Sequence, residues 1–307
     1  MKIAVAICTY NRATLLQQTL TRLTEIDPPT SAEWVVLIVN NRCTDGTDAV
    51  VDAFRGRLPI VYCLEEKQGL SHARNCAIDQ AKALQVDYVI WTDDDVLPES
   101  SWLRAYEAQF REARDAAIFG GPVEPWGEID LPAWFVQNYD LVKSAYAVVD
   151  PALAGETGPV VSGLTPFGAN FALRMRELAT IRFDPRLGVK GASVRMGGEE
   201  CAVIEALLAQ GAQGVWIRHA SVKHFLPKER LTLSYLAWYA RGEGRTLAVV
   251  EGDEPSLWPR KWLLRDLVVH GVQALGFVCL KGTASREFLT AFTATHRAWG
   301  RLFPVRA

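Results

Sequence analysis

The sequence predicts an α/β protein with a mostly parallel sheet flanked by helices, followed by a helical C-terminal extension. Two observations support this prediction. Apolar runs of strand length alternate with amphipathic helical segments along roughly the first 115 residues, and after about residue 230 only helical patterns remain. With 307 residues, 49% of them apolar, the chain can fill one large core or two smaller ones.

The first third of the chain alternates between strand and helix patterns. Four apolar runs of strand length occur there, at Lys2–Cys8, Trp34–Val39, Ile60–Leu64 and from Tyr88. Helical segments lie between them, over Arg12–Ile26, over Thr47–Arg57 and from Ser71, a favourable N-cap. Strands separated by helices favour a parallel, doubly wound sheet. Ligands of such sheets bind beyond the carboxyl ends of the strands, so we expect the functional site there.

Polar residues follow each predicted strand at its carboxyl end. They are Thr9–Arg12, Asn40–Gly46, Glu65–Gly69 and the triplet Asp93–Asp95. Three adjacent carboxylates at the end of a buried strand repel one another unless a cation lies among them. Mg²⁺ or Mn²⁺ suits this pattern, because such ions take one or two protein carboxylates and leave positions for phosphate oxygens. The alternative is a solvated acidic loop or a helix start.

Charge, motifs and cysteine content limit the function classes. The chain has 33 basic and 35 acidic residues, which argues against a general nucleic-acid-binding surface. Neither a G-x-G-x-x-G after a strand nor a P-loop occurs, so side chains and a metal would have to hold a nucleotide. The six cysteines form no CxxC pair, which suits a reducing cytosol. The apolar run near Met1 is too short for a signal peptide or a membrane span, so we expect a cytoplasmic protein.

The second half adds further strands and a helix that begins with two acids. Strands are predicted at Asp115–Gly121, at Val215–His219 and at Ser221–Phe225. Glu199 and Glu200 fall in the first turn of a predicted helix, where the macrodipole favours an ionised carboxylate and so a general base. Ordinary capping is the alternative. His224 is predicted on a core or cleft face, where a lone histidine is more often structural than a metal ligand.

The C-terminal segment is predicted to be helical. The expected helices are Leu231–Val250, with a break or kink at Gly242 and Gly244, then Leu257–Leu280 and Ser285–Leu302. The apolar run Val268–Leu280 is short and polar residues precede it, so it is not predicted to span a membrane. Two alternatives stay open. The helices pack on the first domain or on a second copy in a homodimer, or they lie on a membrane surface with Trp258, Trp262, Arg260, Lys261 and Arg265.

Four segments together resemble the family 2 glycosyltransferases. They are Cys8–Arg12, Val39–Thr47, Gly69–Asn75 and Asp93–Asp95, and they occur in the family's order and spacing. The resemblance implies a GT-A type, Rossmann-like fold over residues 1–227, with a nucleotide-sugar-binding half at 1–115 and an acceptor-side half at 116–227. Residues 228–307 are then the helical extension.

The resemblance also implies an activity and a set of site residues. A sugar is expected to pass, with inversion, from a nucleoside-diphosphate sugar to the hydroxyl of a glycan, lipid-linked or small-molecule acceptor, with Mg²⁺ or Mn²⁺ as cofactor. The implied metal ligands are Asp95, Asp93 and His224. The implied donor-binding residues are Thr9, Tyr10, Arg12, Asn40, Asp45, Gly69, Arg74, Asp93 and Asp94. Glu200 is the expected base and Glu199 binds the acceptor, or the reverse. The resemblance also implies a strand within Phe167–Arg174 that lines the acceptor side with Asn170, and Trp126 is expected to stack on a sugar ring.

Two positions depart from the family pattern. Asn40 stands where the family has Asp, which weakens the inference of a uracil base, although UDP remains the favoured nucleotide. Glu200 stands where Asp is usual, and its extra methylene moves the carboxylate by about 1.5 Å. Two other functions are weighed. One is a non-catalytic nucleotide-sugar-binding scaffold. The other is a sugar-phosphate nucleotidyltransferase, which would carry a Gly-rich basic loop where Thr9–Arg12 stands.

Overall fold

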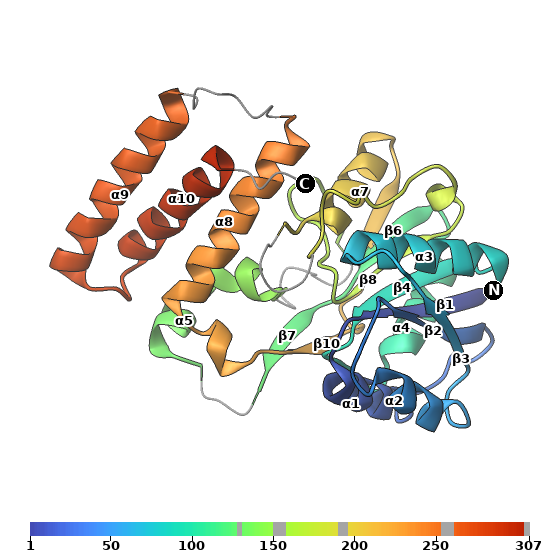
Figure 1. The fold of residues 1–307 in the computed structure, drawn as a ribbon. Helices are drawn as coiled ribbons and strands as arrows, with labels where there is room; N and C mark the ends of the chain where they lie inside the picture. Colours follow the sequence, from blue (N-terminus) through green and yellow to red (C-terminus); the bar gives the residue numbers. More distant parts are fainter. Residues whose placement is uncertain (128–130, 150–157, 190–195, 253–260, 304–307) are drawn as a thin grey trace. The chain divides into compact units, whose positions relative to one another are not determined.

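The chain forms two compact units, which are described separately. The computed structural model describes residues 1–127, 131–149, 158–189, 196–252 and 261–303 (Figure 1). Unit 1 comprises Met1–Trp126, Ala147–Pro185 and Glu199–Phe225. Unit 2 comprises Gly127–Tyr146, Arg186–Gly198 and Leu226–Ala307. The two shorter segments of unit 2 fall within the first domain predicted from the sequence, whereas their contacts assign them to unit 2.

Unit 1 is built on a seven-stranded sheet in the described part of the chain. Its strands are β1 (Lys2–Thr9), β2 (Glu33–Asn40), β3 (Ile60–Leu64), β4 (Tyr88–Asp93), β6 (Ala116–Gly120), β8 (Phe171–Arg174) and β9 (Gln213–Trp216). Their order across the sheet is β3-β2-β1-β4-β8-β6-β9. Among these strands β8 alone runs antiparallel to its neighbours, so the mostly parallel α/β sheet predicted from the sequence is confirmed.

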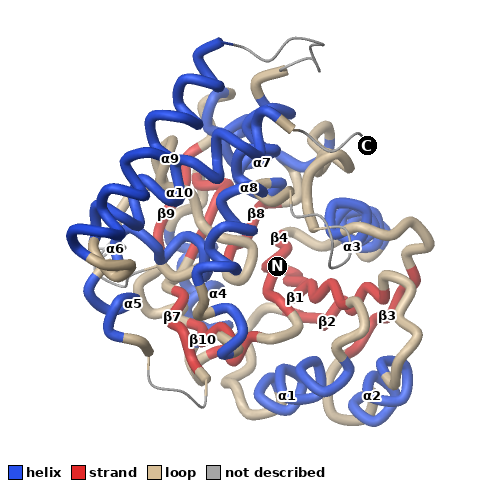
Figure 2. The backbone as a smooth tube through the Cα atoms, turned by 60° about the vertical axis from the view of Figure 1, so that its left-hand side comes forward, coloured by secondary structure: helices blue, strands red, loops and turns tan. Residues whose placement is uncertain are grey.

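Helices cover both faces of this sheet. They are α1 (Ala13–Leu23), α2 (Thr47–Phe54), α3 (Leu70–Ala83), α4 (Trp102–Glu112) and α7 (Glu199–Ala209), with a 3₁₀ turn at Glu177–Ala179. Figure 2 shows α1 and α2 on one face of the β1–β3 edge and α3 on the other. Helix α3 begins at Leu70 with Gly69 as its N-cap, so the prediction of Ser71 as the cap is wrong. Gly69 has φ +135°, a conformation that side chains rarely adopt.

The carboxyl ends of β1 to β4 lie side by side. In the parallel ladders Thr9 is opposite Asn40, Asn40 is opposite Leu64, and Cys8 is opposite Asp93. The polar residues that follow the four strands therefore meet at one edge of the sheet, where the sequence places the functional site.

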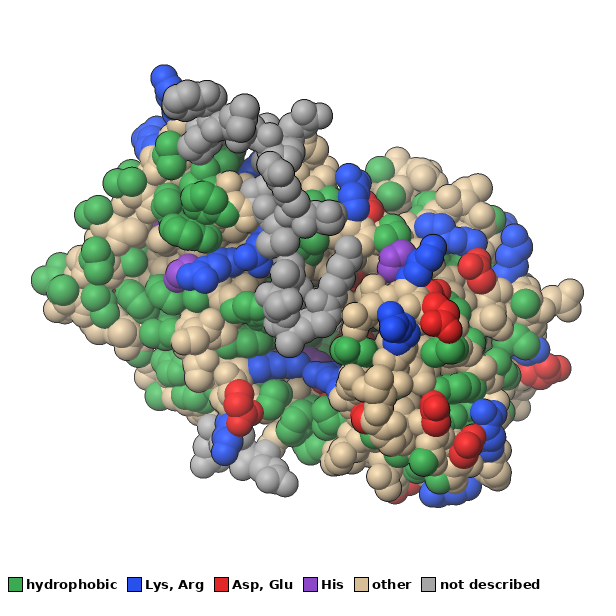
Figure 3. Space-filling view, viewed as in Figure 1, with side chains coloured by type: hydrophobic (Ala, Val, Ile, Leu, Met, Phe, Trp, Pro, Cys, Tyr) green, Lys and Arg blue, Asp and Glu red, His purple; other side chains and the backbone are tan. Residues whose placement is uncertain are grey.

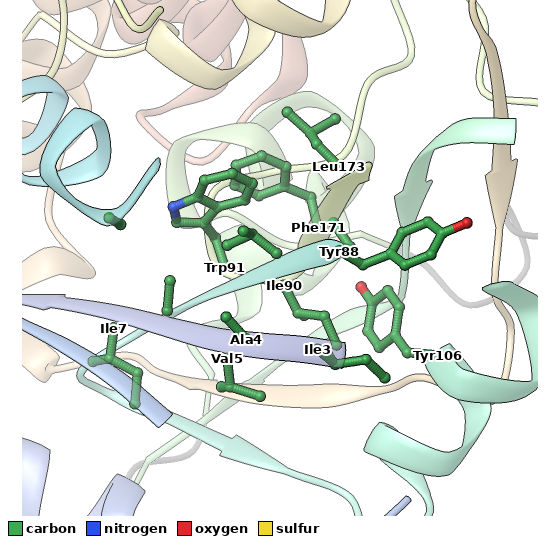
Figure 4. Close-up of a cluster of buried hydrophobic side chains, with 14 of the residues drawn as sticks. Ile3, Ala4, Val5, Ile7, Tyr88, Ile90, Trp91, Tyr106, Phe171 and Leu173 are labelled. Carbon is green, nitrogen blue, oxygen red and sulfur yellow. The ribbon is translucent and has the colours of Figure 1, made fainter. Parts of the chain in front are cut away.

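Aromatic side chains fix β4 and its neighbours in the core (Figure 4). Trp91 stacks on Phe171 of β8 with ring centroids 4.9 Å apart, and Tyr88 stacks on Phe110 of α4 at 3.9 Å. Both indole and phenyl rings of the first pair are fully buried. Aromatic pairs of this kind contribute stability beyond the area that they bury. They hold the strand that ends in the Asp triplet.

A second, three-stranded sheet places His224. Its strands are β5 (Val96–Pro98), β10 (Val222–Phe225) and β7 (Val123–Trp126), in the order β5-β10-β7. His224 on β10 lies opposite Val96 on β5. Because Val96 follows Asp95 directly, this pairing brings His224 beside the Asp triplet. The strand predicted at Val215–His219 ends earlier, at Trp216, because the chain turns before β10.

A buried glutamate anchors the loop that leads into β2. Glu107 of α4 is 2% exposed and accepts hydrogen bonds from the backbone N–H groups of Thr30, Ser31 and Ala32 at 2.5 to 3.0 Å. The hydroxyls of Thr30 and Ser31 donate to the same carboxylate. Burial alone would raise the pKa of Glu107, but these donors outweigh it and lower the pKa to about 2. The carboxylate therefore contributes to stability only while it is ionised.

Unit 2 is helical in its described residues. It contains α5 (Ala133–Gln137), α6 (Tyr139–Val142), α8 (Leu233–Val250), α9 (Lys261–Lys281), α10 (Arg286–Leu302) and 3₁₀ turns at Lys143–Tyr146 and Lys228–Arg230. The C-terminal helices predicted from the sequence are thus confirmed. Residues Trp258 and Arg260, named with them, lie outside the described residues. Helix α9 is long and apolar enough to cross a membrane on length and composition alone, unlike the shorter run predicted from the sequence.

Helix α8 continues through both glycines that were predicted to break or kink it. A Cβ atom on Gly244 would lie 2.0 Å from the carbonyl oxygen of Arg297 on α10. A Cβ atom on Gly300 would lie equally close to the carbonyl oxygen of Arg241 on α8. The glycines therefore let the two helix backbones approach closely, and packing overrides their low helix propensity.

Candidate functional site

Three possible metal-ligating side chains converge at the end of β4. Asp93 is the last residue of β4, Asp95 lies in the turn to β5, and His224 comes from β10. One ligand atom from each lies within 4.8 Å of the others. His224 Nε2 is 3.3 Å from Asp95 Oδ1, and both side chains are buried. The sequence brings these residues together through the β5–β10 pairing.

The middle carboxylate of the triplet has a different role. Asp94 is buried, its Oδ2 accepts a hydrogen bond from Thr9 Oγ1 at 2.8 Å, and its backbone carbonyl accepts one from Thr19. Arg12 Nη1 lies 2.8 Å from both Asp94 Oδ1 and Asp95 Oδ2. These contacts tie the loops after β1 and β4 together. The carboxylate of Asp94 therefore bonds to Thr9 and Arg12 within the protein, whereas the resemblance implies that it binds the donor.

Burial dominates the electrostatics of the triplet. It raises the pKa of Asp93, with Asp95 adding to the effect and Arg74 and His224 opposing it. It likewise raises the pKa of Asp94, against the favourable charge of Arg12. Burial opposes the charge on Arg12 too, but Asp95 and Asp94 outweigh it and raise the pKa of Arg12. The acids are therefore close enough to repel one another, and a further positive charge would stabilise their ionised forms.

The donor set fits one divalent cation. Two ligands on opposite sides of a hard cation are separated by about twice a bond of 2.0 to 2.6 Å. The spread of 4.8 Å among Asp93, Asp95 and His224 matches this separation. Carboxylates suit Mg²⁺ and Mn²⁺, and three protein ligands leave further positions for a substrate.

A buried ion pair forms the other side of the site. Arg74 of α3 is 2% exposed, and its Nη1 donates to Glu199 Oε1 at 2.8 Å. The same nitrogen is 3.6 Å from Glu200 Oε2. Burial opposes the charge on Arg74, but Glu199, Glu200 and Asp93 outweigh it and raise the pKa of Arg74. Arg74 thus pairs with the two acids of α7, whereas the resemblance implies that it binds the donor.

Glycine at position 168 allows this arrangement. The Gly168 N–H donates to Glu200 Oε1 at 3.1 Å. A Cβ atom at this position would lie 2.3 Å from Arg74 Nη2. The Arg74 guanidinium also lies over the rings of Phe171 and Phe183, at 5.4 and 5.5 Å from their centroids. Glu200 is therefore oriented from both sides, and Arg74 is enclosed by packing.

The two acids of α7 differ in accessibility. Glu199 is buried against Arg74, while Glu200 is partly exposed and keeps some contact with solvent. The arrangement therefore favours Glu200 over Glu199 as the group that meets a substrate. The prediction that Glu199 binds the acceptor does not fit this geometry, because its carboxylate forms the ion pair with Arg74.

Other predicted donor-binding residues lie at the same edge of the sheet, and they differ in how far their side chains are already hydrogen-bonded within the protein. Tyr10 is exposed after β1. Asp45 accepts hydrogen bonds from the N–H groups of Ala13 and Thr47, so it caps the starts of α1 and α2. Asn40 Nδ2 donates to Asp48 and Tyr62, and its Oδ1 accepts from the Cys43 N–H. Both amide hydrogens of Asn40 are therefore used internally, and one lone pair of Oδ1 remains for a ligand.

The loop before α3 is held by a residue that the sequence analysis did not single out. Asn41 Oδ1 accepts a hydrogen bond from the Gly69 N–H at 2.7 Å. Its Nδ2 donates to the carbonyl oxygens of Glu65 and Lys67. Its position among the polar residues after β2 indicates a functional role for Asn41. The neighbouring sequence does not show that its side chain bonds to the loop after β3 rather than to a ligand.

The prediction that Asn170 binds the acceptor is wrong. Its side chain is fully buried, and Oδ1 accepts hydrogen bonds from Trp102 Nε1 and Tyr106 Oη, both at 2.9 Å. Its Nδ2 donates to the carbonyl oxygens of Pro122 and Ala220. Every hydrogen-bonding position of the amide is thus filled by the protein. Asn170 joins α4 to the segments that lead into β7 and β10.

Trp126 lies at the end of β7, with its ring 5.2 Å from that of Phe225 on β10. It is half-buried, so part of its indole is open to a ligand. Its proposed contact with an acceptor stays a prediction.

Residues 4–135 match the model of the family described as Glycosyl transferase family 2. This part of the chain therefore resembles the family 2 glycosyltransferases, in agreement with the resemblance that the sequence motifs indicate. The match includes β1 to β4 and the Asp triplet, while Glu199, Glu200 and His224 lie beyond it.

Curated relatives align over the same region. Hyaluronan synthase of Pasteurella multocida is 26% identical over 148 residues, which are 46% of this chain and 14% of that protein. The uncharacterized glycosyltransferase YfnE of Bacillus subtilis (strain 168) is 29% identical over 98 residues, 32% of this chain and 24% of that protein. The chain thus spans less than a quarter of either relative's length.

Solved structures share the fold over nearly the whole chain. Mannosyltransferase PcManGT of Pyrobaculum calidifontis, in complex with GDP-Man and Mn²⁺, gives a TM-score of 0.62 at 16% identity and covers 97% of this chain and 85% of that one. S. aureus TarS 1–349 gives 0.54 at 16% identity, covering 97% and 91%. TarS 1–349 was also solved in complex with UDP-GlcNAc. These likenesses show the GT-A fold.

Proposed function

We propose that this glycosyltransferase moves a sugar from a nucleoside-diphosphate sugar to an acceptor hydroxyl, with inversion at the anomeric carbon. The convergence of Asp93, Asp95 and His224 at the sheet edge carries the proposal, because these three groups could hold a cation, and a bound cation could take the oxygens of a diphosphate. The family and the donor complexes of the structural neighbours support the same reaction class.

The donor diphosphate is proposed to lie at the Asp triplet, where Asp93, Asp95 and His224 would hold a divalent cation. When bound, the cation would neutralise the charge that develops on the leaving diphosphate. Arg12 and Thr9 keep the loop of the triplet in place through Asp94. We propose Mn²⁺ over Mg²⁺, because an imidazole beside two carboxylates is a softer donor set than Mg²⁺ prefers.

Glu200 is proposed as the general base. It would take the proton of the acceptor hydroxyl as this oxygen attacks the anomeric carbon in line with the departing diphosphate. Gly168 and Arg74 fix the orientation of its carboxylate. Glu199 is then a positioning residue, since it acts through Arg74. Trp126 remains the proposed acceptor contact.

Thr9, Tyr10, Arg12, Asn40, Asp45 and Gly69 are proposed to surround the nucleotide, directly or through the loops that they hold. UDP is the favoured nucleotide and GDP the second, the latter because PcManGT was solved with GDP-Man. A growing glycan is the favoured acceptor, because one relative is a hyaluronan synthase. Lipid-linked and small-molecule acceptors are the alternatives. The six cysteines are free, which supports a reducing, cytoplasmic setting.

The proposal is tested by calorimetric titration with UDP, GDP, CDP and TDP, with Mn²⁺, with Mg²⁺ and with chelator. We expect one nucleotide to bind in the presence of metal, and binding to be lost in Asp95→Ala. Asp52→Ala is the matched control, because Asp52 is an exposed acid on α2. If no nucleotide binds with metal, or if Asp95→Ala binds as the parent does, the donor site is misassigned. Donor hydrolysis and sugar transfer, measured on the same samples, separate an enzyme from a binding scaffold.

A further inference from the structure

Helix α9 of unit 2 exposes a continuous apolar face. Among the described elements α10 is its main packing partner, and only 11% of its most apolar 18-residue window is buried. Val268, Val272 and Leu275 are 62%, 65% and 68% exposed. Their spacing of four and three residues puts them on one side of the helix. Exposed apolar surface of this extent marks an interaction site.

The apolar surface continues along the helix and onto α10. Leu264 and Cys279 extend the row, and no charged residue occurs between positions 267 and 280. Beside the row an open groove of about 540 Å³ lies between α9 and α10, with Gly271 and Val278 on one wall and Phe292 on the other. Figure 3 shows hydrophobic side chains gathered over the α9 side of the molecule.

The charge of unit 2 indicates what covers this face. Its segments contain 16 Lys and Arg residues against 10 Asp and Glu, a net charge of +6, whereas unit 1 has 17 against 25, a net charge of −8. Lys261 and Arg265 are exposed at the start of α9 and share the face of Val268 and Val272. Two copies of so basic a unit repel each other, while an anionic lipid surface attracts it.

The polar residues of α9 and α10 favour a position on the bilayer surface rather than across it. Asp266 and His270 interrupt the first half of α9. Arg286, Glu287 and Arg297 lie on α10, which packs along α9 and would have to follow it into the hydrocarbon. Trp262 is half-exposed at the start of α9, and its ring lies 4.9 Å from the Arg301 guanidinium, an amphipathic pair suited to the headgroup level.

We propose that the face of α9 from Leu264 to Cys279 docks on an anionic lipid bilayer. The aliphatic side chains lie below the headgroups, and Lys261 and Arg265 lie at the level of the lipid phosphates. The inference rests on unit 2 alone and does not depend on the proposed sugar transfer.

Flotation of the full chain with vesicles tests the proposal. We expect binding to vesicles of phosphatidylcholine with 30 mol% phosphatidylglycerol, weaker binding at high salt, and little binding to phosphatidylcholine alone. Val272→Asp with Leu275→Asp should weaken partition by at least about tenfold. Lys261→Glu should weaken it by about fivefold on anionic vesicles only. These side chains are exposed, so the variants are expected to fold, which circular dichroism checks.

Val136→Asp is the control, since this valine is exposed on α5 and the substitution places an aspartate on unit 2 away from the α9 face, with one of the two negative charges that the double variant adds. It should bind vesicles as the parent does. The proposal is overturned if the parent ignores anionic vesicles, or if the double variant binds them equally well. It is also overturned if sedimentation shows a parent dimer that the double variant dissociates while neither binds vesicles, because the face is then a contact between copies.

Discussion

Units 1 and 2 differ in what they bury and what they expose. Unit 1 buries charged groups, and Arg74, Asp94 and Glu107 each have an ion-pair or hydrogen-bond partner. Unit 2 leaves aliphatic side chains of α9 in solvent. Both features cost free energy, through desolvation of charge in the first case and hydration of apolar surface in the second. The difference agrees with the two proposals made above, catalysis in unit 1 and attachment to a bilayer by unit 2.

The largest effect is expected at Glu200, the proposed base in unit 1. Glu200→Gln keeps the shape of the side chain but cannot accept the proton, so we expect kcat to fall by about 10³-fold, or about 4 kcal/mol. The nucleotide Kd should not change, because Glu200 is proposed to act on the acceptor and not on the nucleotide. Glu199→Gln leaves the Arg74 charge partly uncompensated, so its main effect should be lower stability. If Glu199→Gln abolishes transfer in a stable protein while Glu200→Gln stays active, the two roles are reversed.

The buried carboxylate of Glu107 on α4 should make the stability of unit 1 depend on pH. Because the folded pKa of Glu107 is about 2, below the ordinary value near 4.5, its contribution is complete above pH 4.5 and is lost as the pH falls toward 2. Glu107→Gln should lower the free energy of unfolding by about 3 kcal/mol at pH 7 and by a little less than half of that at pH 3. Urea titrations at both pH values, followed by tryptophan fluorescence, measure this. Glu112→Gln, at an exposed position of the same helix, is the control, and an equal loss at both pH values contradicts the assignment.

Gly168→Ala tests whether Arg74 positions the catalytic carboxylate. The added Cβ would clash with Arg74 Nη2, so the guanidinium must move and Glu200 loses part of its support. A displacement of about 1 Å at such a site costs about 10²-fold in kcat. Donor binding should be retained, and Gly56→Ala, whose Cβ meets nothing within 4 Å, should leave both quantities unchanged. An unaltered kcat in Gly168→Ala would remove Arg74 from the catalytic arrangement.

Local patterns were sufficient for the strands and the acidic edge. β3 has the predicted bounds, and the polar ends of β1 to β4 meet because parallel strands align their carboxyl ends. The place of β8 was not predictable in this way. It pairs with β4, about 80 residues away, and its direction follows from contacts rather than from its own sequence.

The same limit explains the residues that were misassigned. Asn170 looks like a ligand-binding amide in the sequence, but its partners Trp102, Tyr106 and Ala220 come from distant segments. Gly168 carries no local sign that Arg74 passes beside it. Buried polar roles depend on neighbours that only the fold supplies, whereas strand ends depend on periodicity that the sequence contains.

The smallest effect is expected from Gly244→Ala, which should lower the stability of unit 2 without changing that of unit 1. Gly244→Ala adds a Cβ where the Arg297 carbonyl of α10 approaches, so we expect the α8–α10 contact to lose about 2 kcal/mol despite the better helix propensity of alanine. Gly276→Ala is the matched change on α9, where the Cβ meets nothing within 4 Å, and it should stabilise that helix by about 0.5 to 1 kcal/mol.

Hydrogen exchange resolved by peptide measures the stability of the two units separately. If Gly244→Ala speeds exchange in α8 and α10 alone, units 1 and 2 unfold independently, because loss of a contact within unit 2 then leaves the stability of unit 1 unchanged. Equal acceleration across β1 to β4 contradicts it and means that the two units unfold as one.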